Sequence, residues 1–174
     1  GEVFGFYFSG EGPWPRQLQA YDFGDGGMRW AFDLAGALDC FIAADLDGDG
    51  RREVVCSSLA VDNGACAPDG SEDAYSYVYA CSADGGLLWR YEVGDRYTGP
   101  AVQVQDLDRD GRQDVLILVA CDHENRRAEG YREVGWVARL DEAGQEVARY
   151  DSGGTRLFNL LTVDADEDGE LDIL

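Results

Sequence analysis

Three short acidic segments share a pattern of carboxylates that is suited to binding a metal ion. Each has aspartates at positions 1, 3 and 5 and a glycine at position 6: Asp45, Asp47, Asp49 and Gly50; Asp106, Asp108, Asp110 and Gly111; Asp164, Asp166, Asp168 and Gly169. Glycine permits the sharp turn that wraps alternate carboxylates around one cation. Calcium takes about six to eight oxygen ligands, and without a cation such close carboxylates repel one another. The pattern therefore predicts about three calcium sites.

The acid that follows the glycine distinguishes these segments from a helix-flanked EF-hand. An EF-hand carries its bidentate Glu at position 12, whereas position 12 is Cys56 in the first segment and Ile117 in the second. An acid stands at position 9 instead, as Glu53, Asp114 and Asp172. The sequence therefore argues against an EF-hand and adds a fourth carboxylate to each expected site. The alternative is solvated acidic turns without a metal, which three matches in phase disfavour.

The acidic segments belong to an internal repeat. They start at Asp45, Asp106 and Asp164, which are almost evenly spaced along the chain. A hairpin turn recurs with the same spacing, around Gly26, Gly85 and Gly144. The runs that flank both features are short, aliphatic or β-branched, and they lack helical spacing. Each repeat therefore predicts four antiparallel strands, as in one blade of an all-β propeller.

The phase of the repeat predicts how the chain divides into blades. We expect residues 1–36 to form the outer hairpin of a first blade, residues 37–95 a second blade, residues 96–153 a third, and residues 154–174 the start of a fourth. These parts amount to about three blades, whereas a closed ring normally needs roughly four to eight. We therefore expect a fragment of a larger ring, or self-association of several copies into a ring or fibre.

The acidic segments and their flanking strands resemble the FG-GAP or VCBS repeats of integrin α-chain-type propellers. The resemblance implies that calcium bridges the turn between the first two strands of a blade. It also implies that the carbonyl at position 7 is a ligand, which assigns this role to Arg51, Arg112 and Glu170. The hairpins that carry Trp30 and Trp89 resemble the tryptophan-docking blades of quinoprotein-like propellers, where the indole packs between neighbouring blades.

Charge and composition exclude several classes of partner. The chain has 14 basic residues against 35 acidic ones, which gives a formal net charge of -21. Such a charge repels phosphate backbones and anionic lipid surfaces, so we expect no nucleic-acid partner. No apolar run approaches the roughly 18 residues of a membrane-spanning helix, so we expect no membrane insertion. A hydrophobic content of 45% favours a folded protein, either a soluble mature protein or an excised piece of one.

The five cysteines leave more than one arrangement open. They are Cys40, Cys56, Cys66, Cys81 and Cys121, and an odd number leaves at least one unpaired. Two pairs are compatible with the repeat, Cys56 with Cys81 and Cys66 with Cys121. Buried free thiols are the alternative.

Catalysis has little support in the sequence, and we expect a binding function instead. The single histidine, His123, lies in a polar insertion, where a solvated loop residue is the favoured interpretation. Two insertions, Val61–Ala74 and Asp122–Glu133, exceed a tight hairpin and are expected to protrude. They would bind a protein or carbohydrate, or they merely vary in length. We therefore expect a calcium-stabilised binding or adhesion module that is extracellular, periplasmic or at the cell surface.

Two alternatives to this binding module remain open. The first is the propeller domain of a polysaccharide lyase or another secreted carbohydrate-active enzyme, because calcium-loaded propellers of similar repeat type occur in such lyases. In that case Arg126, Arg127 and Arg132 would contact acidic sugars. The second is a structural subunit of a surface layer or fibre.

Overall fold

The protein consists of β-strands and turns throughout the part of the chain that the structure describes. The computed structural model describes residues 2–7, 15–94, 98–122, 134–153, 157, 159–168 and 171–173. The strands are β1 (Glu2–Tyr7), β2 (Gln17–Asp22), β3 (Met28–Asp33), β4 (Ala37–Ala44), β5 (Glu53–Leu59), β6 (Ser76–Cys81), β7 (Leu87–Gly94), β8 (Pro100–Gln105), β9 (Asp114–Asp122), β10 (Val134–Leu140), β11 (Glu146–Asp151), β12 (Thr162–Val163) and β13 (Asp172–Ile173). These residues include no helix, and thus none long and apolar enough to cross a membrane.

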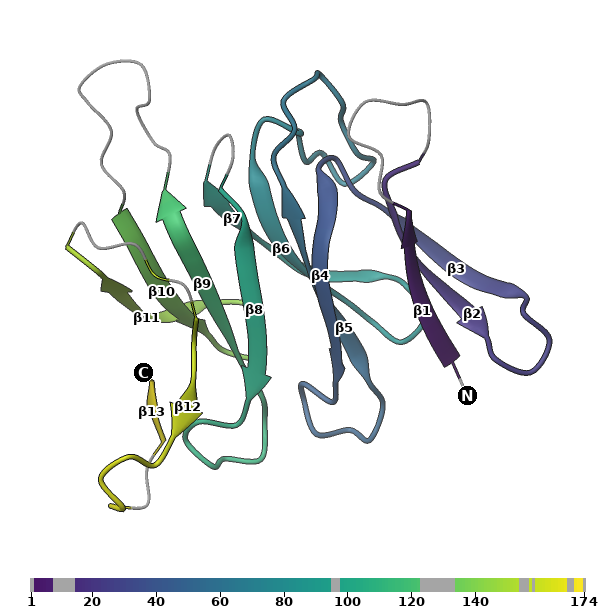
Figure 1. Ribbon diagram of the computed structural model, residues 1–174. Helices are drawn as coiled ribbons and strands as arrows, with labels where there is room; N and C mark the ends of the chain where they lie inside the picture. The colour runs from purple at the N-terminus through teal and green to yellow at the C-terminus, as the bar shows by residue number, and fades with distance from the viewer. Residues whose placement is uncertain are drawn as a thin grey trace.

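Two complete sheets have the same four-stranded arrangement (Figure 1). The orders are β4-β5-β6-β7 and β8-β9-β10-β11, and every pairing is antiparallel. A three-stranded sheet, β1-β2-β3, precedes them, and the pair β12-β13 follows. The prediction of an all-β fold built from four-stranded antiparallel units is confirmed.

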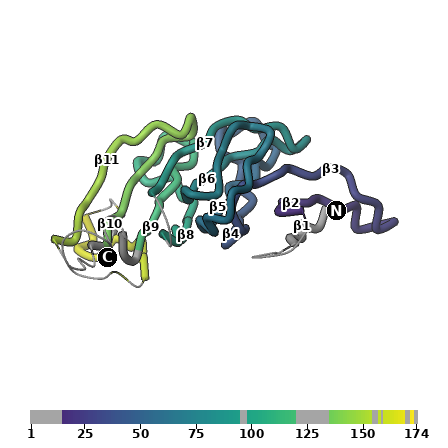
Figure 2. The backbone as a smooth tube through the Cα atoms, turned by 90° about the horizontal axis from the view of Figure 1, so that it is seen from above, coloured from purple at the N-terminus to yellow at the C-terminus, as the bar shows by residue number. Residues whose placement is uncertain are grey.

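The sheets follow one another in chain order, as propeller blades do (Figure 2). The first strands of the two complete sheets, β4 and β8, contact each other. The acidic segments connect β4 to β5, β8 to β9 and β12 to β13, and all three connections lie at the same end of the sheets (Figure 1). Strands rather than helices therefore flank every acidic segment, as the exclusion of an EF-hand requires.

The core lies between neighbouring sheets because the middle strands bury both of their faces. In β5, Val54 and Cys56 belong to the apolar cluster shared with the first sheet, whereas Val55 belongs to the cluster shared with the third sheet, which contains Ile117. This alternation follows the period of two along a strand. The outer strand β11 is exposed along its whole length. Burial therefore falls from the middle strands to the outer edge of the third sheet.

Tryptophans on the outer strands fasten each sheet to the next one. The indole Nε1 of Trp30 donates a hydrogen bond to the Ala83 carbonyl at 2.9 Å, and Trp89 donates to the Glu142 carbonyl at 2.9 Å. Each indole also covers the turn glycine of the following sheet. A Cβ on Gly85 would lie 2.6 Å from the Trp30 ring, and one on Gly144 would lie 2.5 Å from the Trp89 ring. The turn glycines are therefore part of the contact between sheets.

The insertion Val61–Ala74 is folded around a buried carboxylate at the end of the sheet opposite the acidic segments (Figure 1). Asp73 accepts hydrogen bonds from the N–H groups of Asn63 at 2.9 Å and Gly64 at 3.1 Å, and it pairs with Arg16 at 3.1 Å. Burial alone would raise the pKa of Asp73, but these donors outweigh it and hold the pKa below its ordinary value. The insertion is thus tied to the first sheet.

The described cysteine side chains are free thiols. Cys56 lies opposite Tyr79 in the register, not opposite Cys81, so the disulfide between these two cysteines that the sequence left open does not form, and both are free thiols. Burial raises the pKa of Cys56 far above its usual value and that of Cys81 to about 12. Cys66 is also free, and the side chain of Cys121 lies outside the described residues. The buried thiols behave as small apolar groups in the core.

Two further predictions concern residues that the structure does not describe. His123 and most of the second insertion, with the three arginines Arg126, Arg127 and Arg132, lie outside the described residues.

Candidate metal centres

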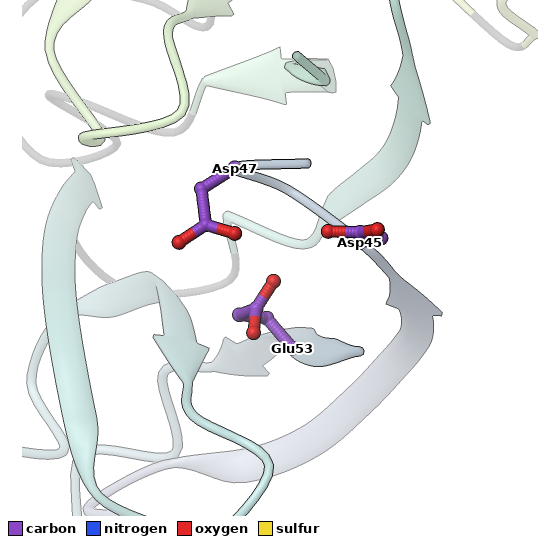
Figure 3. A group of neighbouring side chains, drawn as sticks. All are labelled: Asp45, Asp47 and Glu53. Carbon is purple, nitrogen blue, oxygen red and sulfur yellow. The ribbon is translucent and has the colours of Figure 1, made fainter. Parts of the chain in front are cut away.

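The first acidic loop, residues 45–53, gathers three carboxylates around one small space (Figure 3). Oxygen atoms of Asp45, Asp47 and Glu53 lie within 4.8 Å of one another. Oδ2 of Asp45 accepts the Gly50 N–H at 2.9 Å, whereas Oδ1 of Asp45 is buried and accepts no hydrogen bond from the described residues. A buried carboxylate oxygen without a donor is costly unless a cation lies beside it. The loop therefore has the oxygen ligands of a cation site and a buried carboxylate oxygen that a cation would neutralise.

The acid at position 9 is held in the same way in all three loops. Its oxygen accepts the N–H of the residue at position 2: Glu53 from Leu46 at 2.9 Å, Asp114 from Leu107 at 3.0 Å, and Asp172 from Ala165 at 3.0 Å. The first strand of each sheet leads into position 1, and the second strand begins with the acid at position 9. This bond therefore closes the loop and fixes its width.

Position 4 has a left-handed backbone in all three loops, which the sequence pattern does not reveal. The φ angles are 78° at Gly48, 62° at Arg109 and 62° at Glu167. The glycines at position 6 are also left-handed, with φ of 87° at Gly50 and 91° at Gly111. A non-glycine residue pays about 1 kcal/mol or more for this conformation. The same turn persists without glycine at position 4, so the loop as a whole imposes it.

The second loop, residues 106–114, arranges its carboxylates differently from the first. Oxygens of Asp106, Asp108 and Asp110 converge within 4.8 Å, and the acid at position 9 is not among them. Oδ1 of Asp114 instead accepts a hydrogen bond from Nε of Arg139 at 2.7 Å. The second guanidinium nitrogen of Arg139 contacts Oδ2 of Asp108 at 2.5 Å, and this guanidinium lowers the pKa of Asp108. Arg139 was not among the residues that the sequence predicted, because it lies on β10, outside the acidic pattern.

The third loop brings together the predicted aspartates at positions 1, 3 and 5. Oxygens of Asp164, Asp166 and Asp168 lie within 4.8 Å of one another, and the position 9 acid, Asp172, is not part of this group. Gly169 and Glu170 lie outside the described residues.

In the first two loops the aspartate at position 5 accepts the backbone N–H of position 7, whose carbonyl is a predicted ligand. Asp49 lies outside the converging group of the first loop, and its Oδ1 accepts the N–H of Arg51 at 2.7 Å. Asp110 accepts the N–H of Arg112 at 2.8 Å in the second loop. These bonds hold the backbone N–H of position 7, and the carbonyl of the same residue stays a predicted ligand.

Arginine side chains at position 7 connect the loops to the outer hairpins of their own sheets. Arg51 pairs with Asp84 at 2.8 Å, and Arg112 pairs with Glu142. The first two loops also contact each other, because the Gln113 N–H donates to the Leu46 carbonyl at 2.9 Å. The first two acidic loops therefore contribute directly to the contact between the second and third sheets.

One family model matches part of this arrangement. Residues 45–117 match the FG-GAP-like repeat. The matched segment starts at the first acidic loop and includes the second, so it contains the spacing of one repeat. The family model therefore supports the interpretation of these two loops as repeated units. The comparison of the sequence with curated proteins gives no match.

The fold is similar to that of a carbohydrate-active enzyme. The solved structure of Bacillus licheniformis rhamnogalacturonan lyase PL11 aligns over 97% of this chain with a TM-score of 0.61 and 18% sequence identity. This chain spans about a third of the lyase, 34% of its length. At this identity the likeness shows the fold.

Proposed function

We propose that the chain is a calcium-stabilised segment of an extracellular propeller that serves as a non-catalytic binding or adhesion module. The observation that carries the proposal is the buried Oδ1 of Asp45, which has no hydrogen-bond donor among the described residues and shares a small space with Asp47 and Glu53. Bound calcium would neutralise these carboxylates. The chain itself holds the ligand oxygens in place through the Gly50 and Leu46 N–H groups. The FG-GAP-like match across the first two loops supports the same interpretation.

Binding of calcium to the folded state alone would supply a large part of the stability. With a Kd of roughly 0.1 mM, typical of extracellular modules, and ~1 mM calcium, each site contributes about 1.4 kcal/mol and three contribute about 4 kcal/mol. The same affinity leaves the sites mostly empty at cytosolic calcium. The proposal therefore places the protein outside the cell, in the periplasm or at the cell surface.

Thermal unfolding with and without a chelator tests the metal requirement. In ~1 mM calcium the melting temperature should exceed that in EDTA by roughly 8 to 16 °C, since about 4 kcal/mol shifts a chain of this length by that amount. Calcium added after the chelator should restore the melt. Magnesium at equal concentration should restore less, because it demands a tighter octahedral site. An unchanged melt in EDTA would refute the calcium proposal.

We propose carbohydrate as the first ligand class to examine, because of the similarity to the lyase over nearly the whole chain. The lyase similarity also supports the second candidate function, in which this chain is part of a polysaccharide-cleaving enzyme. Titration with rhamnogalacturonan oligosaccharides measures binding, and the absorbance of unsaturated products measures cleavage. Binding without new unsaturated products favours the module. Products that require this chain favour the enzyme, and no interaction with any oligosaccharide favours a protein ligand.

A further inference from the structure

The third strands of the second and third sheets differ at one position that is equivalent in register. In the second sheet, Val55 on β5 pairs with Ala80 on β6. In the third sheet, the equivalent pair is Leu116 on β9 with Arg139 on β10. Position 80 in the second sheet therefore corresponds to position 139 in the third. The residue at this strand position is an alanine in the second sheet and an arginine in the third, and the arginine contacts Asp108 and Asp114 of the second loop.

The Arg139 guanidinium bonds the position 9 carboxylate of the second loop, whereas in the first loop the position 9 carboxylate converges with two aspartates. In both loops one oxygen of the position 9 acid accepts the N–H of position 2. Glu53 belongs to the converging group with Asp45 and Asp47, whereas Asp114 lies outside its group and accepts a hydrogen bond from Nε of Arg139 at 2.7 Å. Arg139 is only about a quarter exposed, at 26% of its side chain, and Asp114 is buried at 7%. Breaking a partly buried ion pair of this kind is costly, because the remaining charge keeps part of its desolvation penalty.

A small pocket of about 110 Å³ lies beside the second loop, and both Arg139 and Asp114 line it. Asp108 and Asp110 of the converging group line the same pocket. A divalent cation at the second loop would therefore approach a fixed positive charge. The equivalent strand position in the second sheet holds Ala80, which is uncharged and fully buried.

We infer that Arg139 is a built-in cation that partly replaces calcium at the second loop. The second loop then binds calcium more weakly than the first and keeps its fold without it. This inference rests on the proposed function, because it assigns different affinities to loops that the repeat pattern makes equal. Removing a unit charge at the rim of a divalent site changes affinity on the order of tenfold.

Calorimetric titration of the full chain with calcium chloride tests the inference. The Arg139→Ala variant gives the third sheet the residue found in the second, and Arg139→Met retains an uncharged stem of similar length. Both variants should tighten one class of site about tenfold. The added substitution Asp106→Asn should abolish that gain, which assigns the gain to the second loop. The control is Arg109→Gln, which removes a positive charge at position 4 of the same loop and should change affinity less than about twofold.

The possible results separate the inference from the proposed function. No calcium binding by the wild-type chain would refute the proposed function, and the inference with it. Calcium binding that is equal in the wild type, Arg139→Ala and Arg139→Met would overturn the inference and leave the proposed function standing. A gain in calcium affinity in Arg109→Gln equal to that in the Arg139 variants would also overturn the inference. The loss of any one positive charge near the loop would then explain the gain, whatever its position. If Arg139→Ala fails to fold, the Met variant decides.

Discussion

Alanine substitutions at equivalent turn glycines should separate backbone strain from contact between sheets. Gly26 and Gly85 occupy the same place in the repeat and have similar φ angles, 72° and 83°. A Cβ on Gly26 would meet nothing within 4 Å, whereas one on Gly85 would lie 2.6 to 2.8 Å from three ring atoms of Trp30. The Gly26→Ala variant therefore measures the strain of a left-handed alanine, and Gly85→Ala adds a collision with the docked indole.

The expected costs follow from these two terms. Left-handed alanine costs about 1 kcal/mol, and forcing an extra methyl into a packed contact adds about 2 kcal/mol. In urea unfolding at saturating calcium, Gly26→Ala should lose about 1 kcal/mol and Gly85→Ala about 3 kcal/mol. In a Trp30→Ala background the collision is absent, so Gly85→Ala should again cost only about 1 kcal/mol. Equal losses for the two glycines in the wild-type background would refute the docking of Trp30 on this turn.

Three further outcomes are expected from the same structure. Asp45→Asn should remove one class of calcium site in calorimetry and make the melting temperature less sensitive to EDTA, because the buried Oδ1 loses its charge; an unaltered number of sites would contradict this. Trp30→Phe should cost about 1 kcal/mol in urea unfolding, since the bond to the Ala83 carbonyl is lost while the ring stays; stability equal to the wild type would show that this bond does not matter. The pKa of Asp73 is lowered in the folded state, so this carboxylate stabilises the fold fully above its ordinary pKa of 3.8, and the stabilisation disappears as the pH falls through the lower folded pKa. The Asp73→Asn variant should lose about 3 kcal/mol of unfolding free energy at pH 7, and its stability should depend less on pH on the acid side. A variant whose stability keeps the wild-type slope with pH would argue against this role.

The repeat made the local architecture predictable because each feature depends on neighbouring residues. Apolar runs of period two and regularly recurring glycine turns predicted four-stranded antiparallel units, which the sheets β4-β5-β6-β7 and β8-β9-β10-β11 confirm. The acidic pattern predicted four carboxylates for each loop, and three of them converge in the first, Asp45, Asp47 and Glu53, whereas Asp49 lies outside the group. The sequence left a Cys56–Cys81 pairing open because such a pairing depends on the register between strands, and the register places Tyr79 opposite Cys56.

The sequence alone determined the repeat, the strands and the three acidic loops, since a short-range pattern along the chain sets each of them. Only the tertiary structure decided that the loops are not equivalent. Arg139 and Ala80 stand at matching register positions on β10 and β6, far along the chain from the acidic loops of their sheets. The charge that a loop experiences depends on every strand packed beside it, because Coulomb interactions act through space and not along the sequence. The tertiary structure also identified Gly85 as the residue that Trp30 covers, because this packing contact joins two sheets that are far apart along the chain.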